Sequence, residues 1–502
     1  MPYTSCEGSA QHAVAHIRRT ERLFASSSHP SPLKVSVSMV LQCNDLDTIA
    51  AIATPYGESG IGIVRMSGPE AKRIAERVFR PRSGPATLTS HHIRYGDIVD
   101  PEEDKIIDEV LLAFMAAPKT YTREDVVEIN CHGGVGILQR VLEVVLRSGA
   151  REALPGEFTK RAFLSGRIDL SQAEAVLDII QAKTDEGLRL AEEQLRGRLA
   201  QEVARLHEGL VGVLVPIEAY IDFPEEDIEL PSTGRIVEVL QNTLAKIEVL
   251  ISAYAEGEIY RQGVKVAIVG KTNVGKSSLL NLVLERERAI VTAVPGTTTD
   301  VIEEAVNLSG ILIRLMDMAG LREPRNEVEQ EGVRLARGKL SEAHLIILVV
   351  DRSRPLEEED RRIFREVKGK RAILVLNKID LPPCIEAEEA QKATGIKNVY
   401  PLSALRGDGI EELKRGIVGA IVTGRVQRGG EELVPVNLRH KRVLERTKGL
   451  LEEALEGRRR GIPWDLTAFE IKQILSVLGE IVGQTTPEEV LEMIFSRFCI
   501  GK

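Results

Sequence analysis

The stretch VKVAIVGKTNVGKSS, from Val264 to Ser278, constrains the fold more strongly than any other part of the chain. An apolar run typical of a buried strand leads into Gly270, Gly275, Lys276 and Ser277, which have the spacing of a P-loop, and a helical pattern follows. In this context backbone N–H groups and the helix N-terminus bind phosphates, the lysine reaches the β and γ oxygens, and the serine hydroxyl ligates magnesium. The sequence therefore predicts an α/β domain that binds a nucleoside triphosphate.

Three further motifs follow in order, each after an apolar, strand-like run: DMAG at 317–320, NKID at 377–380 and SAL at 403–405. Asp317 and Gly320 stand where a magnesium-side carboxylate and a γ-phosphate-sensing glycine are expected. The Asp380 carboxylate can accept the N1 and N2 hydrogens of guanine, a pair of donors that adenine lacks, so we expect GTP and not ATP. Leu321 replaces the glutamine that orients water in Ras-like proteins, so another group must do so.

The segments on either side of this domain are patterned as helices. SQAE from Ser171 predicts a capping box ahead of an apolar stripe, and Pro216 is expected to break the long helix that follows. Thr467 and Glu470 predict a second capping box, and Thr486–Pro487 predicts the start of a last helix. Since neither apolar stripe can stay exposed, we expect the helical segments to pack together, with the α/β domain inserted between them.

The N-terminal part, from Asp47 onward, has the pattern of a strand, a glycine-rich turn and a strand, with further strands at 109–115 and 125–130. This predicts an α+β unit. The expected domains are an N-terminal domain over 47–165, a helical domain split into 166–263 and 426–502, and the inserted domain over 264–425. Residues 1–46 are expected to be an extension, because 1–38 resemble a transit peptide in composition, or to result from a start codon placed ahead of Met39.

Composition narrows the setting in which the chain works. The net charge of −9 argues against a protein that coats nucleic acid through bulk charge, so any RNA must be bound locally. The five cysteines are scattered without a C-x-x-C pair, as suits a reducing cytoplasm, and no apolar run is long enough to cross a bilayer. We therefore expect a cytoplasmic protein without membrane partners, or an organellar one if residues 1–38 are a transit peptide.

Several segments resemble the tRNA-modification GTPases of the MnmE/TrmE family, and the likeness covers nearly everything from Asp47 to Lys502. They are DTIAAIATPYGESGIGIVRMSG at 47–68, TYTREDVVEINCHGG at 120–134, PGEFTKRAFLSGRIDLSQAEA at 155–175, IDFPEED at 221–227 and the terminal CIGK. A P-loop is shared by many proteins, whereas a G domain inserted ahead of a terminal CIGK is specific.

The resemblance implies a multidomain fold: an α+β N-terminal domain that binds folate and dimerises, an all-α helical domain, and an inserted α/β P-loop G domain. It also implies a potassium-stimulated GTPase that forms a heterotetramer with a FAD-dependent partner of the MnmG/GidA type. Together they would add an aminomethyl or carboxymethylaminomethyl group to C5 of the tRNA wobble uridine, using tetrahydrofolate in its 5-formyl or 5,10-methylene form. The competing interpretation is a ribosome-assembly GTPase, a binding switch without modification chemistry.

The resemblance also assigns residues of the GTP site. Potassium would be bound by Asn273, Thr292, Val294 and Thr297, and magnesium by Ser277 and Thr298. The expected catalytic residues are Glu329, which would orient the attacking water unless it is an ordinary surface glutamate, with Lys276 and Asn273. The residues expected to contact GTP are Asn273, Val274, Gly275, Lys276, Ser277, Ser278, Thr292, Ala293, Val294, Pro295, Gly296, Thr297, Thr298, Asp317, Met318, Ala319, Gly320, Asn377, Lys378, Ile379, Asp380, Ser403, Ala404 and Leu405.

For the folate, the matching positions are Arg65, Glu128, Arg167 and Lys502. An arginine or lysine suits the carboxylates of the folate's glutamate and a carboxylate suits the N–H edge of the pterin, while surface ion pairs are the alternative for the two arginines. Cys499, close to Lys502, is either a nucleophile or a small apolar thiol packed near the folate.

The chain departs from the family pattern at Thr299, Met318 and Arg167, where arginine, threonine and lysine are usual. A change at 299 can alter switch-loop contacts and rate, 318 leaves backbone roles intact, and 167 keeps its charge but changes hydrogen-bond geometry. Cys131 and His132 look like a metal-binding pair but have no further ligands nearby in the sequence, so we expect structural packing.

Overall fold

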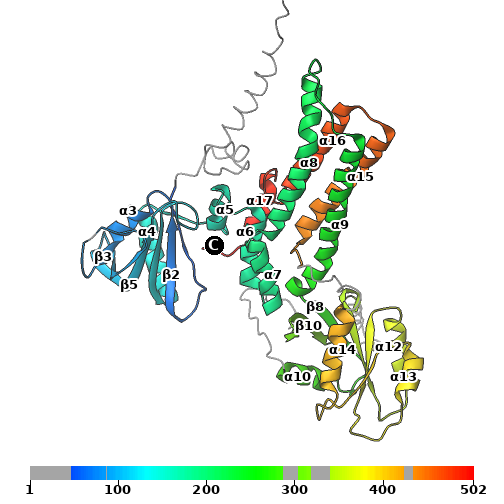
Figure 1. Ribbon diagram of the computed structural model, residues 1–502. Helices are drawn as coiled ribbons and strands as arrows, with labels where there is room; N and C mark the ends of the chain where they lie inside the picture. Colours follow the sequence, from blue (N-terminus) through cyan, green and yellow to red (C-terminus); the bar gives the residue numbers. More distant parts are fainter. Residues whose placement is uncertain (1–46, 86, 287–303, 318–337, 339, 423–432) are drawn as a thin grey trace, which may run out of the picture. The chain divides into compact units, whose positions relative to one another are not determined.

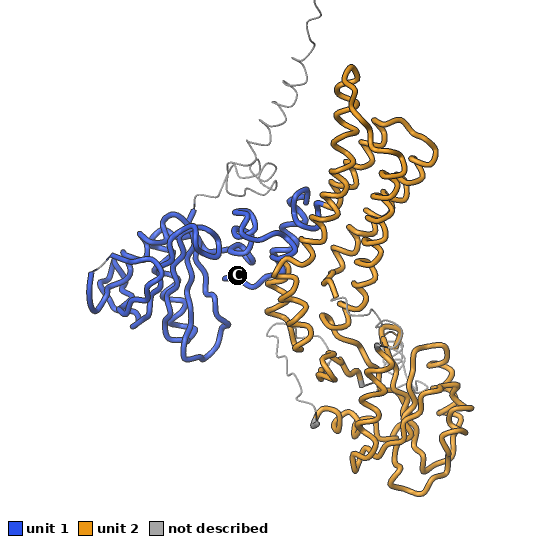
Figure 2. Tube along the Cα trace, viewed as in Figure 1, with its two compact units in different colours: residues 1–173, 479–502 blue, residues 174–478 orange. Residues whose placement is uncertain are grey.

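The computed structural model describes residues 47–85, 87–286, 304–317, 338, 340–422 and 433–502. The chain divides into two compact units, residues 1–173 with 479–502 and residues 174–478 (Figure 2). The expected extension over residues 1–46 lies outside the described residues. None of the helices described is both long and apolar enough to cross a bilayer.

The first unit is built on a seven-stranded sheet in the order β3-β4-β5-β6-β2-β1-β7 (Figure 1). All neighbouring strands are antiparallel except β1 and β7. Helices α3 (Ala71–Val78) and α4 (Val135–Arg147) bury their apolar faces on the sheet and form one core with it. The α+β prediction is confirmed. The strands are β1 (Ile49–Ile52), β2 (Ser59–Ser67), β3 (Phe79–Pro81), β4 (His92–Asp100), β5 (Lys105–Met115), β6 (Val126–Gly133) and β7 (Arg151–Glu152).

The C-terminal segment of the chain returns to this unit. Helix α17 (Glu488–Phe495) packs on α5 (Glu157–Leu164), with the rings of Phe163 and Phe495 6.3 Å apart. Gly501 has a positive φ of 94°, and a Cβ there would lie 2.5 Å from the main-chain oxygen of Ile52. Only glycine therefore lets the terminal CIGK lie this close to β1.

The helices of the second unit come from both sides of the insertion. They are α6 (Leu170–Gln181, which begins in the first unit), α7 (Asp185–Leu195), α8 (Arg198–Asp222), α9 (Thr233–Gln262), α15 (Leu438–Arg460) and α16 (Trp464–Gly479). Helices α9 and α15 lie side by side (Figure 1), and Lys448 on one pairs with Glu248 on the other at 2.6 Å. The prediction that the flanking helical segments pack together is confirmed.

Three local predictions about these helices are wrong. The first capping box is made by Asp169 and Gln172, so α6 begins before Ser171. Helix α16 likewise begins at Trp464, which places Thr467 inside it. Pro216 also lies inside α8, which continues to Asp222; the long helical pattern is broken instead at Gly197, where φ is +82°.

The inserted domain has a six-stranded sheet in the order β13-β12-β11-β8-β10-β9, parallel except for β9 beside β10. Helices α10 (Lys276–Arg286) and α14 (Ile410–Val422) cover one face, and α12 (Glu358–Val367) and α13 (Ala387–Thr394) cover the other. The predicted α/β fold is confirmed. The strands are β8 (Val264–Val269), β9 (Glu304–Leu308), β10 (Ile311–Asp317), β11 (Leu345–Asp351), β12 (Ala372–Asn377) and β13 (Val399–Leu402).

A partly buried charge cluster lies where the chain enters and leaves this domain. Glu174 on α6 accepts hydrogen bonds from Nε and Nη2 of Arg439, each at 2.8 Å. Its Oε2 lies 2.7 Å from Nε2 of the fully buried His440. Arg261, at the end of α9, pairs with Asp178 of α6 at 3.0 Å. Burial alone would raise the pKa of Glu174, but His440 and Arg439 hold it well below its usual range. Both ends of the insertion are thus tied to α6.

Candidate functional site

The phosphate loop lies between the end of β8 and the start of α10. Asn273 and Gly275 have positive φ angles of 64° and 96°. A Cβ on Gly275 would lie 2.2 Å from the side-chain nitrogen of Asn377, so glycine is required there by space as well as by conformation. Ser277 and Ser278 are exposed in the first turn of α10, where a helix N-terminus attracts anions.

Lys276 extends back along the same loop. Its Nζ donates to the main-chain oxygens of Gly270 and Lys271, each at 2.9 Å. The ammonium is therefore held against the start of the loop, just after β8. A phosphate oxygen can replace one of these carbonyl oxygens as its partner.

Asn377 joins three of the four nucleotide motifs. It is 2% exposed at the end of β12, and its Nδ2 donates to the main-chain oxygen of Val274 at 2.7 Å. Its Oδ1 accepts the N–H of Ala404 at 2.9 Å. A single buried side chain thus satisfies both of its polar ends by connecting the phosphate loop to the loop after β13.

The predicted base-recognition residues also lie together. Ser403, fully buried, donates its hydroxyl to Oδ1 of Asp380 at 2.6 Å. This hydrogen bond is the main cause of the lowered pKa of Asp380, so the carboxylate stays ionised and can accept hydrogen bonds from a base. Leu405 is 85% exposed, and Ile379 N–H donates to the oxygen of Leu402 at 3.3 Å.

Lys378 has a partner that the sequence motifs did not indicate. Its Nζ lies 2.6 Å from Oδ2 of Asp351, the last residue of β11, and its backbone φ is +67°. Burial raises the pKa of Asp351, but hydrogen bonds from Lys378 and Ser353 outweigh it and lower the pKa. Asp351 pairs with Asn377 in the parallel register of β11 and β12, so its position depends on tertiary structure and no local motif marks it.

Part of the expected GTP site lies outside the described residues. This holds for Thr292, Ala293, Val294, Pro295, Gly296, Thr297, Thr298, Met318, Ala319, Gly320 and Glu329. Thr299 and Leu321, named above as departures from related proteins, also lie outside the described residues. Asp317 is the last residue of β10, as the motif requires. Of the expected potassium ligands only Asn273 is described, and of the expected magnesium ligands only Ser277.

Three of the four expected folate residues meet in the first unit. Arg65 on β2 stands directly opposite Glu128 on β6, with a shortest contact of 2.8 Å, and also donates to the main-chain oxygen of Gly501 at 3.1 Å. Burial, followed by the charge of Arg65, lowers the pKa of the neighbouring Lys502. Two cationic side chains and one carboxylate thus lie together at this end of the site, where they can donate to and accept from a polar ligand.

Arg167 is connected to this group through two aromatic rings. The Arg65 guanidinium lies 5.8 Å from the ring centre of Phe158, and Tyr121 packs against the apolar cluster that contains Phe158. The Arg167 guanidinium lies 4.8 Å from the ring centre of Tyr121. Both rings lie in segments that carry the family resemblance, at 120–134 and 155–175, but the resemblance assigned neither of them a role.

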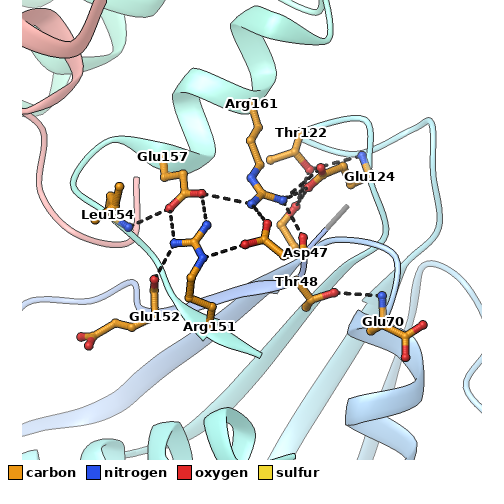
Figure 3. A network of polar contacts seen from close by, with 11 residues as sticks. Asp47, Thr48, Glu70, Thr122, Glu124, Arg151, Glu152, Leu154, Glu157 and Arg161 are labelled. Atoms are coloured by element: carbon orange, nitrogen blue, oxygen red, sulfur yellow. Dashed lines mark hydrogen bonds and ion pairs between the residues drawn. The ribbon is translucent and has the colours of Figure 1, made fainter. Parts of the chain in front are cut away.

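A polar network supports the same region (Figure 3). Arg161 of α5 is 7% exposed and contacts Asp47, Glu124 and Glu157. It donates to Oδ1 of Asp47 at 2.6 Å and to the Asp47 main-chain oxygen at 2.9 Å. The network holds α5 against the sheet, and α5 carries Phe158.

The cysteines of this unit differ in their surroundings. Cys131 is buried, and burial raises the pKa of its thiol to about 11, which makes it a packing residue as expected. Its neighbour His132 is exposed and pairs with Asp108 at 2.7 Å. The described residues contain no cluster of three or more metal-binding side chains. Cys499 is exposed, and its main-chain oxygen accepts the N–H of Lys502 at 3.3 Å.

Two family models and several known proteins are similar to this chain. The model described as "GTP-binding protein TrmE N-terminus" matches residues 48–167, and the "MnmE helical domain" matches residues 170–499. The tRNA modification GTPase MnmE of Geobacter sulfurreducens is 47% identical and aligns with 91% of this chain and 99% of its own. That of Bacillus subtilis is 45% identical over 91% and 100%. The G domain of the T. maritima FeoB iron transporter is 31% identical over 31% of this chain and 98% of its own, with a TM-score of 0.26.

Proposed function

The chain belongs to the MnmE family of tRNA modification GTPases, and we propose that it couples GTP hydrolysis to the modification of C5 of the tRNA wobble uridine. As a member of this family it is a GTP hydrolase that acts in tRNA modification. The observation that carries the proposal is the convergence of the nucleotide motifs on Asn377, in the same chain as the cationic Arg65–Glu128–Lys502 group.

In the proposed GTP site, several of the described residues have definite tasks. Asp380, kept ionised by the hydrogen bond from Ser403, accepts the guanine N–H groups. The ion pair with Asp351 fixes the position of the Lys378 side chain. Lys276 exchanges its main-chain partners for phosphate oxygens and stabilises the charge that develops during hydrolysis. Glu329, which lies outside the described residues, would orient the attacking water.

The residues present fit the two expected cations as far as they are described. Ser277, exposed in the first turn of α10, would hold magnesium together with Thr298. Asn273 would bind potassium with Thr292, Val294 and Thr297, where a monovalent cation supplies the positive charge that an arginine finger supplies in other GTPases.

The residues of the first unit fit a reduced folate. Glu128, with Arg65 and Lys502 beside it, offers the carboxylate that the pterin N–H edge needs, and Arg167 offers a cation for the glutamate carboxylates. Tetrahydrofolate supplies a one-carbon unit when it is bound. Residues 47–165 would form the folate-binding and dimerising domain. Cys499, three residues before Lys502, could act as a nucleophile or pack near the folate.

We propose that GTP-driven closure of G domains across a dimer is passed to the folate site through the helices. The supporting observation is the partly buried cluster in which Arg261 and Arg439, at the two ends of the insertion, both pair with α6. A flavin-dependent subunit would complete the heterotetramer and contribute the redox chemistry. The family match over 48–167 supports this function over a ribosome-assembly switch.

Reconstitution tests the proposal. The chain is incubated with the flavoprotein subunit, reduced folate, GTP, potassium, an amine donor and unmodified tRNA, and nucleosides are measured by mass spectrometry. Modified wobble uridine is expected with the intact chain and with the surface control Lys392→Ala, and not with Lys276→Ala. Equal product from Lys276→Ala would contradict the coupling to GTP.

A further inference from the structure

A basic hollow lies beside Tyr121 in the first unit. Its lining includes Lys119, Thr120, Tyr121, Arg123 and Arg167, and none of the lining residues is acidic. Since exposed cations are usually paired or dispersed among acids on a protein of net charge −9, three cations around one hollow indicate a site for a ligand with several negative charges.

Two of these cations are held in place by the fold. Arg123 has a positive φ of 63°, which is uncommon for a residue with a side chain, and its guanidinium donates to the main-chain oxygen of Ser165 at 2.8 Å. Arg167 is held over the ring of Tyr121 at 4.8 Å. A preorganised cation loses less conformational entropy when it binds an anion than a free one does.

The hollow is the far end of a continuous row of side chains. The row leads from Arg65 to the ring of Phe158, through the apolar cluster that contains Phe158 and contacts Tyr121, and from the ring of Tyr121 to Arg167, so cations stand at its two ends. The two ends differ chemically, because the Arg65 end contains the carboxylate of Glu128 and the Arg167 end contains cations alone.

We propose that this hollow binds the γ-linked polyglutamate tail of the folate, with Lys119, Arg123 and Arg167 pairing with successive tail carboxylates. The inference rests on the proposed folate function and gives that function a direction: the pterin lies at the Glu128 end and the tail leads past Tyr121. A folate tail carries a further carboxylate with each added glutamate. The tail would extend toward the hollow from a pterin bound at the Glu128 end of the row. The hollow therefore selects long-tailed folates.

Calorimetry on the full-length chain tests this directly. The probes are 5-formyl-tetrahydrofolate with one glutamate and with three. Two exposed charge pairs predict that the triglutamate form binds the intact chain about 10-fold more tightly at low salt, and that salt reduces this advantage. In the double variant Lys119→Gln/Arg123→Gln the advantage should fall below about 3-fold while monoglutamate affinity stays the same. The double variant Lys105→Gln/Arg140→Gln changes the charge equally away from the hollow and should retain the advantage.

The possible results distinguish a failure of the polyglutamate site from a failure of the folate proposal on which it rests. If the monoglutamate binds and the added glutamates bring no gain, the polyglutamate site is wrong and the folate proposal stands. If neither form binds, the folate proposal fails and this inference fails with it. If the hollow variant weakens tRNA binding in a gel-shift assay and leaves the glutamate preference intact, the hollow is an RNA contact instead.

Discussion

Nδ2 of Asn377 donates to the main-chain oxygen of Val274 at 2.7 Å, so one buried side chain joins the guanine motif to the phosphate loop. The same side chain accepts the N–H of Ala404 at 2.9 Å. Base recognition and phosphate binding therefore depend on one another, because moving either loop leaves a buried amide without its partner.

Replacing Asn377 with alanine should weaken guanine-nucleotide binding. The change leaves the Val274 oxygen and the Ala404 N–H unsatisfied, at a cost of about 1–3 kcal/mol, which corresponds to about 5- to 150-fold in Kd. Titration with a fluorescent GDP analogue measures the effect. Asn398→Ala, an exposed asparagine at the edge of the same sheet, is the matched control and should bind normally. A Kd for Asn377→Ala within twofold of the intact chain would refute the linking role.

Replacing Asp380 with asparagine should change base preference from guanine to xanthine. The amide can no longer accept two N–H groups, but it can donate to the extra oxygen of xanthine, so GTP turnover should fall about 100-fold or more while XTP becomes a substrate. Steady-state turnover with both nucleotides measures this. Weak activity with both nucleotides would instead indicate that the loop had collapsed, and full GTP activity would remove Asp380 from the base pocket.

Replacing Gly501, the last residue but one, should weaken folate binding without changing GTP turnover. In Gly501→Ala the new methyl group would lie 2.5 Å from the Ile52 oxygen at a backbone φ of 94°, so the terminus should detach and Arg65 should lose its bond to residue 501. Reduced-folate affinity should fall about 10-fold with GTP turnover unchanged. Gly136→Ala, where the methyl group meets open space, should affect neither. Unaltered folate binding in Gly501→Ala would exclude the terminus from that site.

His440 predicts a stability loss in mild acid. Burial lowers the pKa of His440 to about 4, although Glu174 acts to raise it. The unfolded chain, with a pKa near 6.5, therefore takes up the proton first, so this contribution to stability is full above pH 6.5 and declines as the pH falls toward 4.

The single tryptophan, Trp464, reports on this unit because it lies on α16 under the guanidinium of Arg458. Urea unfolding followed by its fluorescence should show a midpoint that falls between pH 6.5 and 4.5, and the fall should be smaller in His440→Gln. His207→Gln, on another helix of the same unit, should keep the intact pH dependence. An identical slope in the intact chain and His440→Gln would show that another group is responsible.

Local motifs predicted the G domain well because phosphate and base binding demand particular residues next to particular strands. Gly275, Asn377 and Asp380 could be placed from spacing alone. Asp351, Tyr121 and Phe158 could not be found this way, because strand pairing and packing bring them to their sites.

The helix boundaries failed for a different reason. Ser171 has the residue type of an N-cap, but Asp169 lies two positions earlier and accepts the Gln172 N–H at 3.0 Å, so the helix starts there. Pro216 is accommodated within α8, where its neighbours Leu214 and Ile217 are buried. A sequence shows which residues can cap or break a helix, and packing decides which of them do.

The central claim is that GTP hydrolysis by this chain drives tRNA wobble-uridine modification. The most direct measurement is nucleoside mass spectrometry of tRNA from cells that lack their own modification GTPase, supplied with the intact chain or with Lys276→Ala at equal expression. The account predicts that the intact chain restores aminomethyl or carboxymethylaminomethyl uridine and the variant does not. Equal restoration by both, or none by the intact chain with a matching flavoprotein supplied, would contradict it.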